Sequence, residues 1–439
     1  MKRFFMIFVV LLLSTFSISF AQVNWTKVEG NPLLPLGPSN SWEDDEVYAP
    51  CVIKVGDTLK MWYTGANSSG VDQIGYATST DGILWQKYAQ NPVLRIGSKG
   101  SWDSQLVVHP EVIFEGSTYH MWYGGSSDPN WYSFDAGYAS SQDGIHWIKY
   151  DDPSTANPPY DQSDPVLKRG DLGKWDDATL AGVSCVFDGA TFHMWYGGCD
   201  GANWANERIG YASSANGINW QKYGENPVFD GDGAWGADLV AAPFVIANTS
   251  GYKMWYSGSD GDHGQIGYAT SHDGINWNPW STPVLEPGAS GTWDNADVGA
   301  PCVLFVDSLY HLWYSGATST TGYRIGYATA SPTGFEEIDS NDFPEDFVLN
   351  QNYPNPFNPT TTIGYQVRAN NYSPVQVDLS IYNLLGQKVA TLVNQKQAAG
   401  NYQVQWDASG FASGIYIYHL KVQGQKQNAV FTKKLVLLK

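Results

Sequence analysis

Short apolar-rich runs, each bounded by a glycine-rich turn, recur along most of the chain. One set reads Pro50-Cys-Val-Ile, then Leu59-Lys-Met-Trp-Tyr, then Ile74-Gly-Tyr-Ala-Thr and finally Ile83-Leu-Trp-Gln-Lys. Runs of this length that are rich in β-branched and aromatic residues are typical of β-strands. An Asp-Gly pair before the last run favours a tight hairpin, because glycine tolerates positive φ. The pattern predicts an all-β protein built of antiparallel hairpins.

The same set of runs occurs five times, at a period of about 60 residues. Each repeat opens with a tryptophan, carries another tryptophan in an MWYTG-like strand, and continues with a GYA strand. Four antiparallel strands per repeat are typical of a propeller blade, so the sequence predicts a five-bladed β-propeller. A linear array of β-modules is the alternative. The repeats, called blades I to V, open at Trp42, Trp102, Trp175, Trp235 and Trp293.

The fifth repeat lacks the tryptophan-containing last run that the other four carry. A matching segment lies near the other end of the chain, where Trp25 is followed by Asn31-Pro-Leu-Leu. This segment can supply the missing outer strand of blade V, which would close the ring and cover an exposed sheet edge. A linear array would not need the missing strand to appear at the opposite end.

Residues 1–22 are predicted to be a signal peptide. A positively charged start precedes an apolar run over 4–13, and small residues precede the expected cleavage at Gln22. The run is too short for a membrane span, although a membrane anchor is the alternative. We expect residues 23–334 to form the propeller of an exported, soluble protein.

The C-terminal part has a different pattern. An acidic stretch over 335–348 is predicted to be a linker, and residues 349–439 contain alternating strand-like runs that predict a small Ig-like β-sandwich. This module resembles the type A sorting domain of the type IX secretion system through NYPNPFNP, IYNLLGQKV, AAGNY, SGIYIY and the terminal KKLVLLK. The resemblance implies contact with that secretion machinery and passage across a bacterial outer membrane. An ordinary Ig-like adhesion module is the alternative.

Composition and charge narrow the function. The net charge of −19 argues against nucleic acid or an anionic membrane as a partner, but it does not argue against a neutral glycan. The cysteines match no zinc-binding spacing, and we expect small buried thiols rather than a disulfide framework. The acidic loops leave room for a structural calcium ion, although none has EF-hand spacing. No other cofactor is indicated, and we expect a monomer.

The innermost strand of each blade should line the central channel, with the residues on both sides of its conserved proline position pointing inward. In four blades these residues are small or apolar, whereas blade II holds His109 and Glu111. Burial should raise the pKa of Glu111, which would suit acid–base catalysis. A pair that only stabilises one blade is the alternative.

The face on which the innermost strands begin, called the top face, carries the other candidates. We expect Asp45 and Asp177 to supply a further catalytic acid. Loop insertions in blades II and III carry Trp131 and Trp204, whose rings suit the apolar face of a sugar, although packing within the loop is the alternative. Further candidates for substrate binding are Glu46, Tyr48, Ser184, Asp238 and Asp297. The acidic residue that directly follows the opening tryptophan in four blades is expected to cap backbone N–H groups.

The strand pattern over 23–334 resembles the five-bladed propellers of glycoside hydrolase families 43, 62, 32 and 68 and of the family 130 mannoside phosphorylases. The family 43 resemblance implies three acids, at the positions of Ala49, Glu111 and Ala181, and only the second is acidic here. The short Asp-box-like turns around Asp81 resemble those of sialidases and are expected to be structural. Phosphorolysis is disfavoured, because basic residues are scarce in the propeller.

These observations predict a secreted carbohydrate-active propeller that acts on neutral oligo- or polysaccharides at the top face of blades I to III. In this hypothesis it is a glycosidase in which Glu111 works with an acid from a neighbouring loop. A non-catalytic glycan-binding or surface-interaction propeller is the alternative, and a protein-interaction propeller is a third. Turnover of a glycan separates the first hypothesis from the others.

Overall fold

The computed structural model describes residues 25–130, 133–201, 206–231, 235–236, 239–248, 251–259, 261, 263–331, 348–367, 375–384, 386–397, 400–423 and 428–438. The predicted signal peptide, most of the predicted linker and the candidates Trp131, Trp204 and Asp238 lie outside these residues. The domain boundaries therefore stay predictions.

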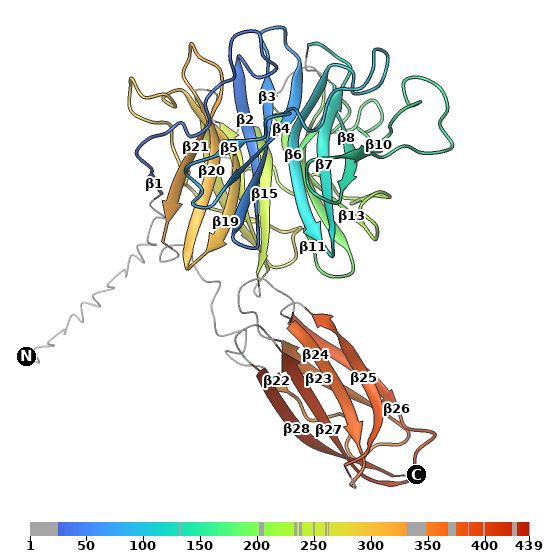
Figure 1. Ribbon diagram of the computed structural model, residues 1–439. Coiled ribbons are helices and arrows are strands. Elements are labelled where there is room, and N and C mark those ends of the chain that lie inside the picture. Colours follow the sequence, from blue (N-terminus) through green and yellow to red (C-terminus); the bar gives the residue numbers. More distant parts are fainter. Residues whose placement is uncertain are drawn as a thin grey trace, which may run out of the picture.

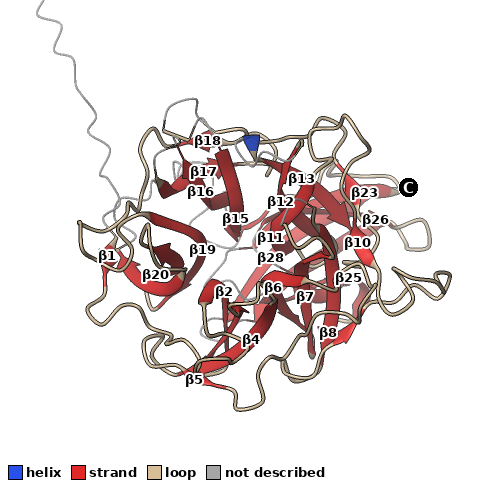
Figure 2. Ribbon diagram, turned by 90° about the horizontal axis from the view of Figure 1, so that it is seen from above, coloured by secondary structure: helices blue, strands red, loops and turns tan. Residues whose placement is uncertain are grey.

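Five four-stranded blades surround a central channel (Figures 1 and 2). The innermost strands are β2 (Glu46–Val55), β6 (Leu106–Glu115), β11 (Thr179–Phe187), β15 (Leu239–Asn248) and β19 (Asp297–Val306). The second strands are β3 (Thr58–Ala66), β7 (Thr118–Ser126), β12 (Phe192–Cys199), β16 (Gly251–Ser259) and β20 (Leu309–Ala317). The third strands are β4 (Asp72–Ser79), β8 (Asp135–Ser141), β13 (Arg208–Ser214), β17 (Gly264–Ser271) and β21 (Arg324–Ala330). The predicted propeller is confirmed.

The outer strands are short, and one of them comes from the far end of the chain. They are β5 (Gln86–Lys87), β9 (Ile148–Lys149), β14 (Gln221–Lys222), β18 (Asn278–Pro279) and, in blade V, β1 (Thr26–Lys27). Strand β1 pairs antiparallel with β21, with Thr26 opposite Thr329. A further strand, β10 (Pro165–Leu167), pairs with β8, and β4 pairs in parallel with β6 between blades I and II. The predicted closure of the ring beside Trp25 is confirmed.

The acidic residue after the opening tryptophan was predicted to cap backbone N–H groups, and this prediction is wrong. Its carboxylate instead accepts a hydrogen bond from a tyrosine and pairs with a lysine of the outer strand, as Glu43 does with Tyr63 and Lys87. In blade V the lysine is Lys27 of β1, with Nζ 2.6 Å from Asp294 Oδ2. Blade IV lacks both the acid and the lysine. The ion pair is therefore a structural element of the blade, and in blade V it helps to close the ring.

The buried tryptophans of the second strands connect neighbouring blades. Trp62 Nε1 donates a hydrogen bond of 2.8 Å to the carbonyl of Gly144, in the Asp-Gly turn of blade II. A Cβ on Gly144 would lie 2.8 Å from the Trp62 ring, so the turn requires glycine for close approach as well as for its positive φ. Equivalent bonds join Trp122 to Gly217, Trp195 to Gly274 and Trp313 to Gly82. The Asp-box-like turns thus stabilise contacts between blades.

The C-terminal strands form two sheets around their own core (Figure 1). One sheet contains β22 (Val348–Leu349), β23 (Thr360–Val367) and β26 (Gly400–Asp407), and the other contains β25 (Lys388–Gln397), β24 (Val375–Tyr382), β27 (Gly414–Gln423) and β28 (Asn428–Leu437). This arrangement is consistent with the predicted Ig-like sandwich. Within the described residues, no helix is long and apolar enough to span a membrane.

Candidate functional site

Each innermost strand contains a β-bulge at its proline position. In blade II, Val108 pairs with Gly124 and Glu111 pairs with Trp122, so the strand carries one extra residue relative to its partner. The residue before the proline position adopts a positive φ, which costs free energy for a residue other than glycine. These residues are Ala49, His109, Gly182, Ala242 and Ala300. The bulge was not predicted from the regular alternation of a strand, and it changes the direction of the side chains around it.

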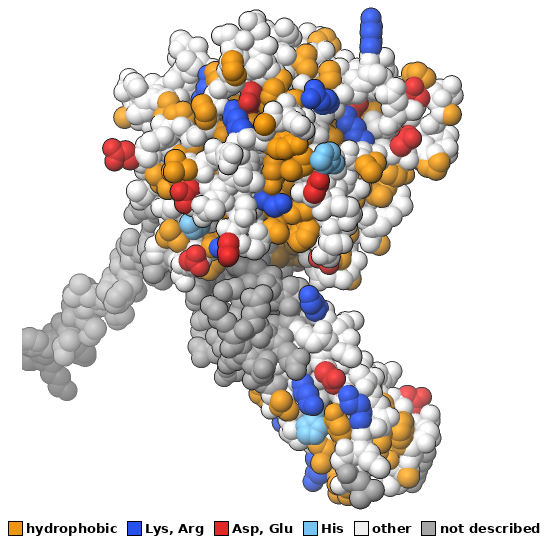
Figure 3. Space-filling model, in the orientation of Figure 1, with side chains coloured by type: hydrophobic (Ala, Val, Ile, Leu, Met, Phe, Trp, Pro, Cys, Tyr) orange, Lys and Arg blue, Asp and Glu red, His pale blue; other side chains and the backbone are white. Residues whose placement is uncertain are grey.

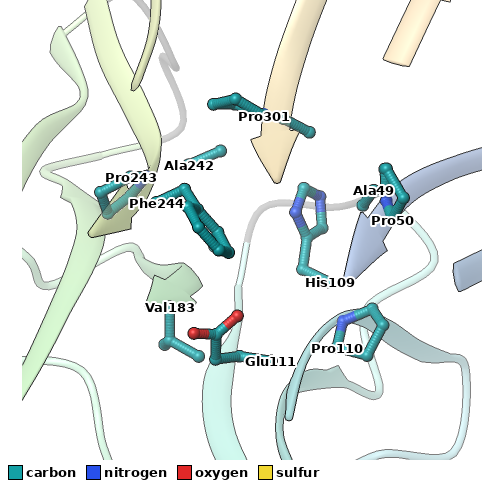
Figure 4. Close-up of a pocket in the computed structure, with 12 residues that line it drawn as sticks. Ala49, Pro50, His109, Pro110, Glu111, Val183, Ala242, Pro243, Phe244 and Pro301 are labelled. Carbon is teal, nitrogen blue, oxygen red and sulfur yellow. The ribbon is translucent and has the colours of Figure 1, made fainter. Parts of the chain in front are cut away.

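The five bulges surround a pocket in the central channel (Figure 4). Its lining consists mostly of alanine, glycine and proline, and its polar side chains are His109 and Glu111. Both side chains extend into the same space as Phe244 from blade IV. The cavity measures about 30 Å³, which is room for one or two water molecules rather than for a sugar ring.

The two carboxylate oxygens of Glu111 contact the two neighbouring blades, III and I. Its Oε1 accepts hydrogen bonds from Cys185 N at 3.0 Å and from Ser184 Oγ at 3.4 Å, and its Oε2 lies 3.6 Å from Cys51 Sγ. The residue is only 6% exposed. Burial raises the pKa of Glu111 from 4.5 to about 7, against the opposing effect of these hydrogen bonds. The carboxyl group can therefore accept or donate a proton near neutral pH.

The same position in other blades makes a related contact, so Glu111 is part of a pattern. The side chain after the proline position accepts the backbone N–H of the next blade's innermost strand. Cys51 Sγ accepts a hydrogen bond from Val112 N, Ser184 Oγ accepts one from Val245 N, and Cys302 Sγ accepts one from Val52 N. We call Cys51, Glu111, Ser184 and Cys302 the floor ring. Its two thiols, like Cys185 and Cys199, are buried and free, as expected.

His109 lies beside Glu111 in a neutral state. Its backbone N donates a hydrogen bond of 3.0 Å to Thr64 Oγ1, and its ring packs edge-on against Tyr48 with centroids 5.7 Å apart. Burial lowers the pKa of His109 to about 4. At pH 7 the ring therefore carries no charge and can offer one donor and one acceptor.

Tyr48 contacts a buried carboxyl group that was not predicted from the sequence. Its hydroxyl donates a 2.5 Å hydrogen bond to Oδ2 of Asp72, the first residue of β4. Asp72 is fully buried, and its Oδ1 has no hydrogen-bond partner among the described residues. Burial raises the pKa of Asp72 to about 7, with a smaller contribution from nearby Glu46. Burial also raises the pKa of Glu46, which accepts a hydrogen bond from Tyr323 N.

A second unexpected acid is Glu207, immediately before β13. It is 7% exposed, and burial raises its pKa to about 8. The structure shows no hydrogen bond or ion pair of its side chain among the described residues. Glu207 and Asp72 stand at the same position relative to the GYA glycine of their blades. We call this position, together with its equivalents, the rim; its residues are Asp72, Phe134, Glu207, Gly264 and Tyr323.

The remaining predicted acids lie in the loops. Asp45 is exposed, and its backbone carbonyl accepts a hydrogen bond from Arg324. The carboxylate of Asp177 accepts hydrogen bonds from the backbone N–H groups of Gly173 and Gly201, and that of Asp297 accepts one from Gly264 N. These contacts support a role in holding the loops. Among the described residues, no three His, Cys, Asp or Glu side chains form a group that could hold a metal ion.

Comparisons with known proteins agree with this architecture. Residues 19–163 match the N-terminal domain of the glycosyl hydrolases family 32. An uncharacterized protein of Mycobacterium tuberculosis (strain CDC 1551 / Oshkosh) is 28% identical over 252 residues, which cover 55% of this chain and 76% of that protein. A 1,2-β-oligomannan phosphorylase of Thermoanaerobacter sp. (strain X514) is 23% identical over 254 residues, which cover 56% of this chain and 75% of that enzyme.

The structural comparison gives the same fold. A glycosyl hydrolase from Bacteroides ovatus superposes with a TM-score of 0.56 at 16% identity, covering 71% of this chain and 95% of that one. At this identity the likeness shows the fold alone. The resemblance to glycoside hydrolase propellers is therefore confirmed, whereas an activity is not established by it.

Residues 351–438 match the secretion system C-terminal sorting domain. This match confirms the predicted sorting module. It indicates export by the type IX secretion system to the outer cell surface or the medium, and it implies an interaction with that machinery.

Proposed function

We propose that this exported protein hydrolyses a neutral glycan bound over the top face of blades I to III. The observation that carries this proposal is the channel pocket, where a ring of small and apolar residues is interrupted by His109 and Glu111. Both residues lie within the segment that matches the family 32 domain. Carbohydrate chemistry is the activity that this pocket and this fold support best.

The size of the pocket suggests how Glu111 would act. A cavity for one or two water molecules beside a carboxylate suits activation of water for attack on an anomeric carbon. Oε1 accepts two hydrogen bonds from blade III, whereas Oε2 accepts a long 3.6 Å bond from the weakly donating Cys51 thiol, so Oε2 is the oxygen that would take the proton of the water. The neutral His109 would orient that water. Contacts of the glycan with Trp131, Trp204 and Asp238 stay predictions from the sequence.

Hydrolysis is favoured over phosphorolysis by the lining of the pocket. Among the described residues, no lysine or arginine lines it, whereas a phosphate substrate needs cationic or backbone N–H donors. On the face shown in Figure 3, basic side chains are scattered singly among acidic and uncharged ones. The similarity to an oligomannan phosphorylase nevertheless makes phosphate a necessary variable in the experiment.

A glycan-binding propeller without turnover is the second candidate. It is favoured by the floor ring, in which Glu111 makes the same kind of interblade contact as Cys51, Ser184 and Cys302. It is favoured also by the alanines at positions 49 and 181, where family 43 enzymes carry acids. In this case Glu111 would stabilise the ring only.

Mass spectrometry of oligosaccharide mixtures separates the two candidates. The secreted full-length chain would be incubated with arabino-, xylo-, manno-, galacto- and fructo-oligosaccharides, with and without inorganic phosphate, beside the Glu111→Gln variant. Shortened sugars with the parent and not with the variant would support hydrolysis through Glu111. Sugar phosphates that appear only with phosphate would indicate phosphorolysis. Binding by calorimetry without any cleavage would support the binding protein.

A further inference from the structure

Glycoside hydrolysis by water normally needs a second carboxyl group, which protonates the leaving oxygen. The predicted partners Asp45 and Asp177 lie in loops, and the carboxylate of Asp177 is engaged by two backbone N–H groups. The rim offers two buried carboxyl groups instead, Asp72 and Glu207. Their surroundings differ in a way that points to one of them.

In blade I, the partner of Asp72 comes from the innermost strand, where the Tyr48 hydroxyl donates to it. The blade III residue at the position of Tyr48 is Ala181, whose methyl group cannot donate a hydrogen bond. The residue at the position of Thr64 is Gly197, which pairs with Ala181. Blade III therefore lacks both hydroxyl groups that blade I carries at these two positions.

The carboxyl group of Glu207 occupies the space that these small residues leave. A Cβ on Gly197 would lie 2.3 Å from Glu207 Oε1 and 3.1 Å from the Ala181 carbonyl oxygen. The carboxyl group thus lies against Gly197, whose strand partner Ala181 directly precedes Gly182 of the channel pocket. A buried carboxyl group without a hydrogen-bond donor costs free energy, and natural proteins tolerate this cost mainly at functional sites.

Glu207 and Glu111 both lie close to β11. Glu111 contacts Ser184 and Cys185 of β11, and Glu207 Oε1 lies beside Gly197, whose strand partner Ala181 is nearer to the top end of β11. The two contacts are three residues apart along β11, on opposite sides of its β-bulge.

We propose that Glu207 is the general acid of this site and that Glu111 is its base. This inference rests on the proposed hydrolysis. Water in the channel pocket attacks the anomeric carbon, and Glu111 takes a proton from the water. The glycosidic C–O bond breaks with both electrons going to the leaving oxygen, which takes the proton of Glu207. The product forms with inverted configuration, and solvent returns each carboxyl group to its starting state.

Burial keeps Glu207 protonated at pH 7, as an acid requires. Glu207 lies close enough to the Cys199 thiol to affect its pKa. The charged groups that act on the same thiol are Asp177, Asp200 and Arg208. None of them makes a hydrogen bond or ion pair with the Glu207 side chain among the described residues.

The test compares two leaving groups on the full-length chain. An oligosaccharide that the parent cleaves is measured beside the 2,4-dinitrophenyl glycoside of the same sugar, whose leaving group needs no proton. Glu207→Gln should reduce kcat on the oligosaccharide by about 100-fold or more and change the activated glycoside by only a few-fold. Glu111→Gln should reduce both. Glu225→Gln, which alters an exposed acid of the same blade, is the matched control.

Each outcome decides the proposal. Equal losses on both substrates, or an unchanged oligosaccharide rate, would overturn the role of Glu207 and leave the proposed hydrolysis standing. An inactive parent would overturn both. Thermal melting at pH 9 checks the structural premise independently of activity. Glu207→Gln should melt several degrees above the parent, because it removes a buried carboxylate that has no hydrogen-bond partner among the described residues. A lower melting temperature would show a stabilising partner of Glu207 and would contradict the proposal.

Discussion

The floor ring and the rim of the channel both contain buried carboxyl groups, but the hydrogen-bond partners of these groups differ. Glu111 in the floor ring accepts hydrogen bonds from the neighbouring blade, as its equivalents in other blades do. Glu207 in the rim has no such partner among the described residues, and Asp72 has one. Burial raises the pKa of all three groups. A raised pKa alone therefore does not show how a buried carboxyl group is held, whereas its hydrogen-bond partners do.

The largest expected effect concerns Glu207. The pKa of Glu207 is about 8 in the folded chain and close to its ordinary 4.5 in the unfolded chain. As pH rises from 4.5 to 8, the unfolded chain releases this proton first, so the contribution of Glu207 to stability falls and levels off above 8. Glu207→Gln should remove this loss, a gain of at most about 5 kcal/mol at pH 9.

Denaturant unfolding at pH 4 and pH 9 measures this gain. The variant and the parent should have similar free energies of unfolding at pH 4. An equal difference at both values would mean that Glu207 does not titrate as described.

The floor ring should respond in the opposite direction. Glu111→Ala leaves Cys185 N without its acceptor and opens a cavity among three blades, so we expect a loss of about 3 kcal/mol. Urea titration at pH 6 would measure it. Glu111→Gln keeps an acceptor oxygen and should lose much less, and similar losses for both variants would argue against the interblade contact.

Blade I can be changed to resemble blade III. Tyr48→Phe removes the hydroxyl that donates to Asp72, so this variant should lose about 1–2 kcal/mol at pH 8. At pH 5 the loss should be smaller, because the carboxyl group of Asp72 is then protonated in the folded chain. Free energies of unfolding at the two pH values test this, with Tyr323→Phe as the control at the rim. A loss that does not change with pH would contradict the role of the Tyr48–Asp72 bond.

The smallest effect on stability should accompany a large effect on function. Gly197→Ala places a methyl group where Glu207 Oε1 now lies, and the flexible end of the glutamate can move away. We expect a change in stability below about 1 kcal/mol, together with the loss of oligosaccharide cleavage that Glu207→Gln shows. Gly198→Ala is unsuitable as a control, because its Cβ would meet the buried Trp175 ring. Full activity of Gly197→Ala would argue against the position proposed for the acid.

The sequence by itself was sufficient for the architecture. Repeated strand patterns predicted the five blades, and the displaced Trp25 segment predicted the pairing of β1 with β21, which the structure confirms. The comparison of repeats also singled out His109 and Glu111, which line the channel pocket. These predictions succeeded because strand periodicity and repeats are local properties of the chain.

Only the tertiary structure decided which buried acids have hydrogen-bond partners. Asp72 and Glu207 occupy equivalent positions, and their difference depends on Tyr48 and Ala181, which belong to other strands. The bulge at His109 likewise depends on pairing with the second strand and on the Thr64 hydroxyl of the neighbouring blade. Burial and hydrogen bonding of a side chain are set by atoms that are distant along the chain. The pattern around a single residue therefore does not reveal them.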